Sequence, residues 1–137
     1  MFGALEISSS ALTAQRTNLN VIAGNIANMH TTRTPSGGPY RRRVVLFAPG
    51  NPAMGKDAPG VHVRRIVADP TPFRKEFNPS HPDAVQAGPD KGYVLMPNVD
   101  QSTEMVNAMA AARAYEANVT VMEVTKNLAA ASLRLLA

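Results

Sequence analysis

The sequence predicts an α+β fold in which two long terminal helices enclose a small β-rich middle region. Three observations predict it: all 11 prolines lie between Pro35 and Pro97, apolar residues recur at seven-residue spacing toward both ends, and β-branched segments bounded by Gly or Pro fill the middle. We therefore divide the 137 residues into an N-terminal helix and turn (1–34), a β and loop domain (35–97) and a C-terminal helix (98–137).

The N-terminal helix is predicted over Leu5–Met29, with a length of about 37 Å at 1.5 Å per residue. Its main apolar line repeats every seven residues. In the second half of the helix, the position three residues after each repeat is apolar as well. The line consists of Leu5, Leu12, Leu19, Ile22, Ile26 and Met29. A second line of Ile7, Ala14 and Val21 lies at about 160° from the first, so two sides of the helix need cover.

Two strands are predicted in the middle region, at 40–47 and 61–67, because both segments are β-branched and bounded by Gly or Pro. The segments 73–77 and 93–96 are weaker candidates. The connections 34–39, 48–60 and 79–92 are too polar and too rich in proline for helix. With few large hydrophobic side chains, this module can bury only a small core.

The C-terminal helix is predicted to begin after Pro97 and Asn98, with Asp100 or Ser102 as N-cap and Glu104 complementing the helix dipole in the first turn. One apolar seam follows a heptad repeat: Met105, Ala108, Ala112, Tyr115, Val119, Met122, Ala129, Leu133 and Leu136. A second line lies on nearly the opposite side: Val121, Val124, Leu128, Ala131 and Leu135. The N-terminal helix can cover only one of these lines.

Helices from other copies or other proteins are therefore expected to cover the remaining line. A large apolar side chain left in water would forgo about 1.5 to 3 kcal/mol. The sequence thus predicts a structural subunit that polymerises through its terminal helices. The expected interface residues are Leu5, Leu12, Leu19, Ile22, Ile26, Met105, Ala112, Tyr115, Val119, Val121, Met122, Leu128, Leu133 and Leu136.

No enzyme activity, cofactor or metal site is expected from the residue types and their spacing. The chain has no Cys, and His30, His62 and His81 lie far apart, without the spacing of metal ligands. No apolar run approaches the roughly 20 residues that cross a bilayer, and the N-terminal residues do not resemble a cleaved secretory signal.

A basic patch is the main alternative function that the residues suggest. The net charge is +4, and adjacent strands at 41–43 and 64–65 could collect five guanidinium groups able to bind phosphate or carboxylate. Few aromatics are present to stack on bases, so we expect no nucleic-acid binding. Because adjacent strand residues point to opposite faces, a solvated or subunit-facing surface is the preferred interpretation.

The segments 11–16 and 21–28, followed by Thr31 and Thr32, resemble the N-terminal signature of the flagellar rod and hook protein family. The segments 31–42, 69–73, 78–84, 92–99, 104–106 and 112–119 are most similar to the proximal rod subunits of that family. Gly24 and the pair Met29 and His30 depart from the family pattern. The motif residues that match are Asn25, Ile26, Ala27, Asn28, Thr32, Gly37, Gly38, Pro39, Tyr40, Pro97 and Asn98.

This resemblance implies a subunit of the bacterial flagellar basal body, placed in the periplasmic rod and exported through the flagellar type III apparatus without a cleaved signal. Both helices would pack into a tubular inner layer and present the central domain outward. The implied partners are other rod subunits and copies of the chain, with the surrounding rings and the export gate as further candidates. Another rod or hook subunit remains the nearest alternative, and a basic binding module the more distant one.

Overall fold

The computed structural model describes residues 2–50, 52, 55 and 58–136. The elements in chain order are α1 (Phe2–Ala27), β1 (Arg43–Pro49), β2 (Val61–Ala68), β3 (Arg74–Phe77), β4 (Tyr93–Met96) and α2 (Gln101–Leu136). The strands form two small antiparallel sheets, β1 with β2 and β3 with β4. The predicted α+β class, with terminal helices around a small β region, is confirmed.

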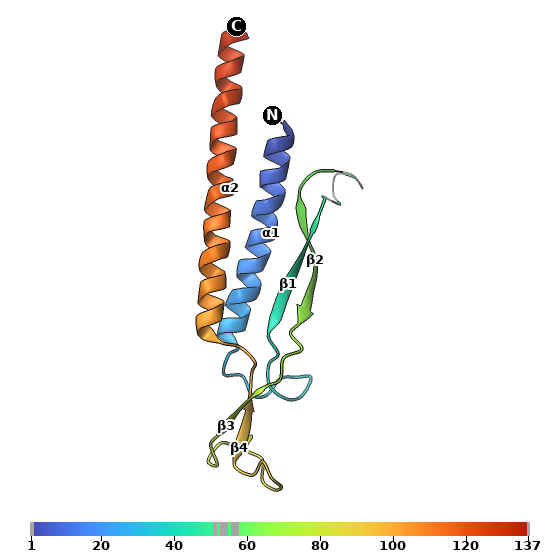
Figure 1. Ribbon diagram of the computed structural model, residues 1–137, viewed down its shortest axis with the longest axis vertical. Helices are drawn as coiled ribbons and strands as arrows, with labels where there is room; N and C mark the ends of the chain where they lie inside the picture. The colour runs from blue at the N-terminus through green and yellow to red at the C-terminus, as the bar shows by residue number, and fades with distance from the viewer. Residues whose placement is uncertain (1, 51, 53–54, 56–57, 137) are drawn as a thin grey trace.

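The two helices lie side by side and run in opposite directions (Figure 1). α1 has 26 residues and α2 has 36, which at 1.5 Å per residue gives about 39 and 54 Å. α2 therefore continues beyond the N-terminal end of α1, as Figure 1 shows. Among the described residues, no other helix lies beside the C-terminal part of α2.

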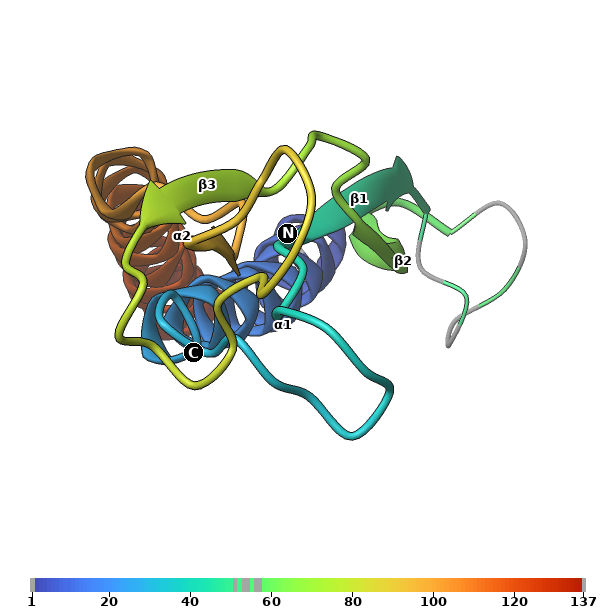
Figure 2. The ribbon, with the colours of Figure 1, turned by 90° about the horizontal axis from the view of Figure 1, so that it is seen from below.

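The β1–β2 hairpin packs along α1, so that α1 lies between this hairpin and α2 (Figure 2). Its register pairs Arg43 with Ala68 and Pro49 with Val61, with an irregularity between Leu46 and Phe47. The hairpin thus covers the side of α1 that faces away from α2, which is one of the two sides that the sequence leaves uncovered.

The β3–β4 hairpin lies at the end of the molecule opposite the free end of α2 (Figure 1). Both strands are short and pair from Arg74 with Met96 to Phe77 with Tyr93. The rings of Phe77 and Tyr93 meet edge to face, with 5.2 Å between their centroids. These are the two segments that the sequence marked as weaker strand candidates.

Buried apolar residues are few and mostly small. They are Ala14, Ile22, Val45, Ala84, Val94, Val99 and Ala111. Three polar residues are buried as deeply: Ser8, Asn25 and Glu104. Because apolar burial is so limited, the contacts that these polar residues make contribute much of the definition of the fold.

Side chains cap the C-terminal end of α1 and the N-terminal end of α2. Asn28 Nδ2 donates to the Gly24 carbonyl at 2.9 Å, which satisfies a carbonyl in the last turn of α1. Asp100 Oδ2 accepts from the Thr103 amide at 2.8 Å, so Asp100 rather than Ser102 is the N-cap of α2. The structure starts α1 at Phe2 and ends it at Ala27, each a few residues before the predicted bounds.

Candidate assembly surface and helix junction

A cluster of polar side chains joins the base of the two helices to the start of β1. We call it the junction cluster; its members are Asn25, Tyr40, Arg42, Asp69 and Glu104. They come from α1, the segment before β1, the segment after β2 and the first turn of α2. Glu104 has 0% and Asn25 1% relative exposure, so both side chains must find their hydrogen-bond partners within the protein.

Asn25 uses both ends of its amide. Its Nδ2 donates to the Arg43 carbonyl at 2.8 Å and to Glu104 Oε2 at 3.0 Å. Its Oδ1 accepts from the Arg43 amide at 2.9 Å and from the Tyr40 hydroxyl at 3.0 Å. A single α1 side chain thus holds the first residue of β1 by both backbone groups and also contacts α2.

Arg42 bridges two carboxylates. Its Nε donates to Glu104 Oε1 at 2.6 Å, and one terminal nitrogen donates to Asp69 Oδ2 at 2.9 Å. Burial of the guanidinium opposes its charge, but the hydrogen bonds to Glu104 and Asp69 outweigh this and raise the pKa of Arg42. The Thr71 amide and side chain, followed by Arg42, lower the pKa of Asp69. Arg42 and Asp69 are therefore held in their charged forms.

Asn98, predicted as a motif residue, fixes the chain just before α2. Its Oδ1 accepts from the Arg42 amide at 2.8 Å, and its Nδ2 donates to Thr71 Oγ1 at 2.9 Å. The preceding Pro97 is buried, and its carbonyl accepts from Arg74 Nε at 3.1 Å. These two motif residues thus attach the entry to α2 to the segment before β1, the segment between β2 and β3, and the start of β3.

The segment between α1 and β1 forms a closed loop. The Thr34 amide donates to the Gly38 carbonyl at 2.9 Å, and the Tyr40 amide donates to the Thr31 carbonyl at 2.9 Å. Gly37 and Gly38 have φ angles of 86° and 73°, in the left-handed region that favours glycine. This closure sets the position from which the Tyr40 hydroxyl reaches Asn25.

The remaining motif residues lie around this loop. Thr32 Oγ1 donates to Asp83 Oδ2 at 2.8 Å, and Arg33 pairs with the same carboxylate. Both contacts lower the pKa of Asp83. Ile26 is half-buried and Ala27 is exposed at the end of α1, while Pro39 is half-buried before Tyr40.

The preferred interpretation, a solvated or subunit-facing arginine surface, is wrong for Arg42, and the alternative patch of five guanidinium groups does not form because Arg41 and Arg42 bind within the chain. Arg42 points into the junction cluster. The Arg41 guanidinium lies 4.1 Å from the centroid of the Phe73 ring and donates to the Asp69 and Thr71 carbonyls. These contacts direct nitrogens of both arginines to nearby carbonyls and carboxylates.

Glu104 lies in the first turn of α2, as predicted. The structure also buries it in an ion pair with Arg42, a partner that the sequence did not indicate. A signal was present, because Glu104 precedes Ala111 by one heptad, and these are the two buried residues of α2. Apart from the family resemblance, nothing in the sequence indicated that Asp69 pairs with Arg42.

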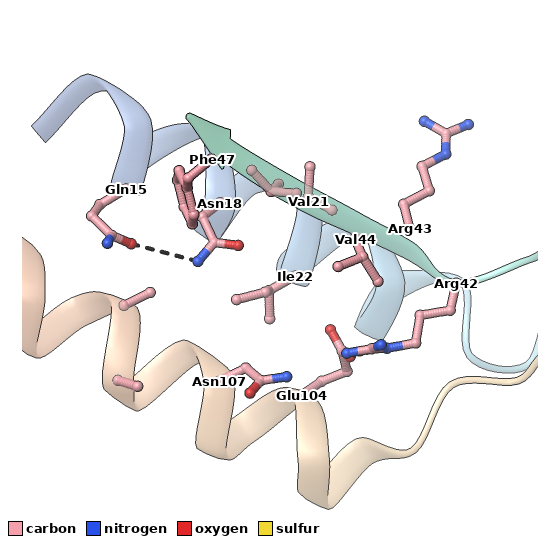
Figure 3. A pocket seen from close by; sticks show the side chains of 13 residues that line it. Gln15, Asn18, Val21, Ile22, Arg42, Arg43, Val44, Phe47, Glu104 and Asn107 are labelled. Carbon is pink, nitrogen blue, oxygen red and sulfur yellow. Dashed lines mark hydrogen bonds and ion pairs between the residues drawn. The ribbon is translucent and has the colours of Figure 1, made fainter. Parts of the chain in front are cut away.

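A hollow of about 340 Å³ opens above the cluster between α1, β1 and α2 (Figure 3). Ile22 projects into it from α1, while Arg42 and Glu104 meet at its lower end and Arg43 points away. Gln15, Asn18 and Asn107 supply amide groups to its wall. Among the described residues, no group of three or more His, Asp or Glu side chains is placed to hold a metal ion.

The predicted interface residues fall into three groups. Ile22 is buried within the chain at 5% exposure, so we remove it from the assembly surface. Half-buried members are Leu5, Leu12, Leu19, Ile26, Ala112, Tyr115, Val119 and Met122. Exposed members are Met105, Val121, Leu128, Leu133 and Leu136.

The half-buried residues of α2 recur every three or four positions, as expected of a strip lying along α1. The second line of α2 is exposed throughout: Val121, Val124, Leu128 and Leu135 are 47%, 52%, 59% and 89% exposed. An apolar surface of this kind, continued along a helix, is typical of a protein interface.

No helix in the described part of the chain is both long and apolar enough to span a membrane.

Two family models match the chain. "Flagella basal body rod protein" matches residues 5–33, and "Flagellar basal body rod FlgEFG protein C-terminal" matches residues 90–135. A relative from Borreliella burgdorferi, named flagellar basal-body rod protein FlgC, is 43% identical over 99% of this chain and 97% of its own length. The chain belongs to the FlgC family of flagellar basal-body rod proteins.

Other FlgC proteins are similarly close. The relative from Yersinia enterocolitica is 45% identical over 95% of this chain and 93% of its own length. The relative from Bacillus subtilis is 41% identical over 93% of this chain and 92% of its own length. The two family models include most of α1 and α2 and the motif residues Asn25, Ile26, Ala27, Asn28, Thr32, Pro97 and Asn98.

Proposed function

We propose that this chain is a structural subunit of the proximal rod of the bacterial flagellum, which polymerises through its two helices into a tubular drive shaft. The observation that supports this most is the exposed apolar line of α2, from Val121 to Leu135. The chain's own α1 and β1–β2 hairpin occupy other positions, so neighbouring subunits are the natural cover for this line. The proposal assigns no catalytic role to the chain.

The energetics favour assembly by many modest contacts. Burial of one large apolar side chain contributes about 1.5 to 3 kcal/mol when complete, and ordering the backbone costs about 1 to 2 kcal/mol per residue. An exposed helix end therefore gains little alone but becomes stable when both of its sides are covered. Repetition of such contacts over many subunits would give a shaft that resists torsion.

The location and partners in this proposal follow the family. We infer that the chain lies in the periplasmic rod, that it reaches this site through the flagellar type III export apparatus, and that it contacts other rod subunits and copies of itself. The surrounding rings and the export gate are further candidate partners.

Leu128→Asp tests the assembly surface in a strain that lacks the native copy of the gene. A charge at this exposed apolar position should prevent incorporation into isolated basal bodies and abolish motility, because burial of an unpaired carboxylate is costly. The matched control is Asn127→Asp, which places the same charge on the neighbouring exposed residue.

Circular dichroism of the purified variants separates assembly from folding. Both variants should keep the native spectrum, since neither position is buried. Normal incorporation of Leu128→Asp would contradict the proposed surface.

A further inference from the structure

We propose that Arg113 selects the neighbour that covers the apolar line of α2, by pairing with a carboxylate on α2 of a second copy of this chain. The carboxylates that we assign to this role are Glu116 and Glu123, which we call the acidic line. The proposal rests on the proposed assembly through the helices, and it adds the residues that choose the neighbour and set its register.

The exposed apolar line extends further toward the base of α2 than the segment 121–135. Its members recur every three or four residues, and all of them are exposed. They are Val106, Ala110, Ala117, Val121, Val124, Leu128, Ala131 and Leu135. The repeat has one charged position, which is occupied by Arg113. A helix that packs along the whole line therefore meets a single charge within it.

Arg113 takes part in none of the ion pairs that the described residues form. Glu116 follows it by three residues, a spacing at which helix side chains can pair, yet the two do not pair in the structure. A guanidinium that is covered by apolar side chains and has no carboxylate beside it is costly. Cover of the apolar line therefore favours a neighbour that supplies an acidic group at Arg113.

The acidic line provides such groups at the edge of the apolar line. Glu116 and Glu123 are seven residues apart, so they lie on one side of α2, and both are exposed. At about 100° per residue, Glu116 lies about 60° around the helix from Arg113. In the part of the chain that the structure describes, neither carboxylate forms an ion pair. Charged residues that flank an apolar seam in this way set the choice and the register of a partner helix.

A second copy of the chain fits because each copy carries both halves of the pair. Arg113 lies within the apolar line, whereas the acidic line lies beside it, so the two charges belong to different strips of α2. A copy can therefore direct Arg113 to one neighbour and its acidic line to the next. Contacts between different surfaces are heterologous, and they can continue from copy to copy without closing on a pair.

Arg113→Glu tests the pairing in a strain that lacks the native copy of the gene. The amount of the chain in isolated basal bodies should fall about tenfold or more, because carboxylates then face each other across the contact. Arg113→Lys keeps the charge and should be incorporated. The control is Lys91→Glu, which makes the same change of charge at an exposed position outside the helices and should be incorporated normally.

Circular dichroism of the purified variants separates folding from assembly. Arg113→Glu should keep the native helical spectrum, because residue 113 is exposed and a like-charge pair within a helix is only slightly unfavourable. Normal incorporation of Arg113→Glu would overturn the proposal.

Rescue between two different chains shows whether the pair joins separate copies. At least one of Glu116→Arg and Glu123→Arg should fail to incorporate alone, and the same variant should restore incorporation when it is co-expressed with Arg113→Glu. Where the two chains alternate, every contact again joins opposite charges. A pair within one chain cannot be restored by mixing, because each chain keeps its own altered charges.

Mass spectrometry of the rescued basal bodies should find both variants. Absence of rescue with both carboxylate variants would overturn the proposal. Leu128→Asp keeps this outcome distinct from the proposed function. If Leu128→Asp prevents incorporation while Arg113→Glu does not, the assembly surface stands and the pairing fails.

Discussion

Arg42 Nε donates to Glu104 Oε1 at 2.6 Å across 62 residues of sequence, and the Glu104 side chain is completely buried. The ion pair therefore ties the entry to β1 to the first turn of α2. A buried pair contributes little net stability over a well-packed apolar pair, but removal of one partner leaves an unpaired buried charge. The pair should thus be far more sensitive to single substitutions than a surface pair.

Arg42→Met should lower the free energy of unfolding by about 3 to 5 kcal/mol, because Glu104 stays buried without its guanidinium partner. Urea unfolding at pH 7 measures this. The control is Lys75→Met, which breaks the pair with Asp90, whose side chains are 51% and 49% exposed. It should cost about 1 kcal/mol or less. Equal losses of unfolding free energy for Arg42→Met and Lys75→Met would contradict the expectation that the buried pair is the more sensitive one.

The sequence predicted the helices and all four strands because each is a local pattern of period 3.5 or 2. β1 was expected at 40–47 and begins instead at Arg43. The difference arises because the Tyr40 amide donates to the Thr31 carbonyl and the Arg42 amide donates to Asn98 Oδ1, so neither amide pairs with β2. Side-chain hydrogen bonds of this kind compete with a strand ladder and carry no periodic signal.

The junction cluster could be predicted only in part. The family motif pointed to Asn25, Tyr40 and Asn98 without indicating what they touch. The sequence placed Glu104 in the first turn of α2 but could not identify its partner, since contact between distant segments depends on how the loops close. The same gap explains why the sequence did not indicate that Arg42 points into the junction cluster.

Gly92→Ala should destabilise the β3–β4 hairpin. Gly92 has a φ of 82°, and an added Cβ would lie 2.8 Å from Phe77 Cε2, so backbone strain and a clash with an aromatic ring combine. The strain alone costs about 1 to 2 kcal/mol. Gly88→Ala is the control, because Gly88 has a φ of 91° and open space around the added Cβ.

Thermal unfolding of the two glycine variants should show a larger loss for Gly92→Ala. A similar loss in both would mean that the Phe77 ring moves aside at little cost and that strain alone matters.

Stability should fall in acid through Asp69, Asp83 and Asp100, whose pKa values are all lowered from 3.8. For Asp69 the causes are the Thr71 amide and side chain and then Arg42. A lowered pKa in the folded state means that the unfolded chain binds more protons, so this stability is complete above about pH 5 and disappears as pH falls through the folded values.

Urea unfolding between pH 7 and pH 3 measures this loss. Asp69→Asn should be less stable at pH 7 and should lose less on acidification than the native chain. An unchanged pH dependence in that variant would show that Asp69 does not contribute to it.

Ile22 and Leu128 separate the core of the chain from its assembly surface, although their heptad positions gave them the same predicted role. Ile22 is 5% exposed and Leu128 is 59% exposed. In the purified monomer, Ile22→Ala should lower the free energy of unfolding by about 2 to 5 kcal/mol, because it leaves a cavity between α1, β1 and α2. Leu128→Ala should change it by about 0.5 kcal/mol or less.

Sedimentation at the working concentration confirms that both variants are compared as monomers, and urea unfolding gives the two free energies. If Leu128→Ala destabilised the monomer as much as Ile22→Ala, then the second line of α2 would already be covered within the free chain. That result would remove the main physical reason for assembly through this helix, because no apolar surface would be left for a neighbour to bury.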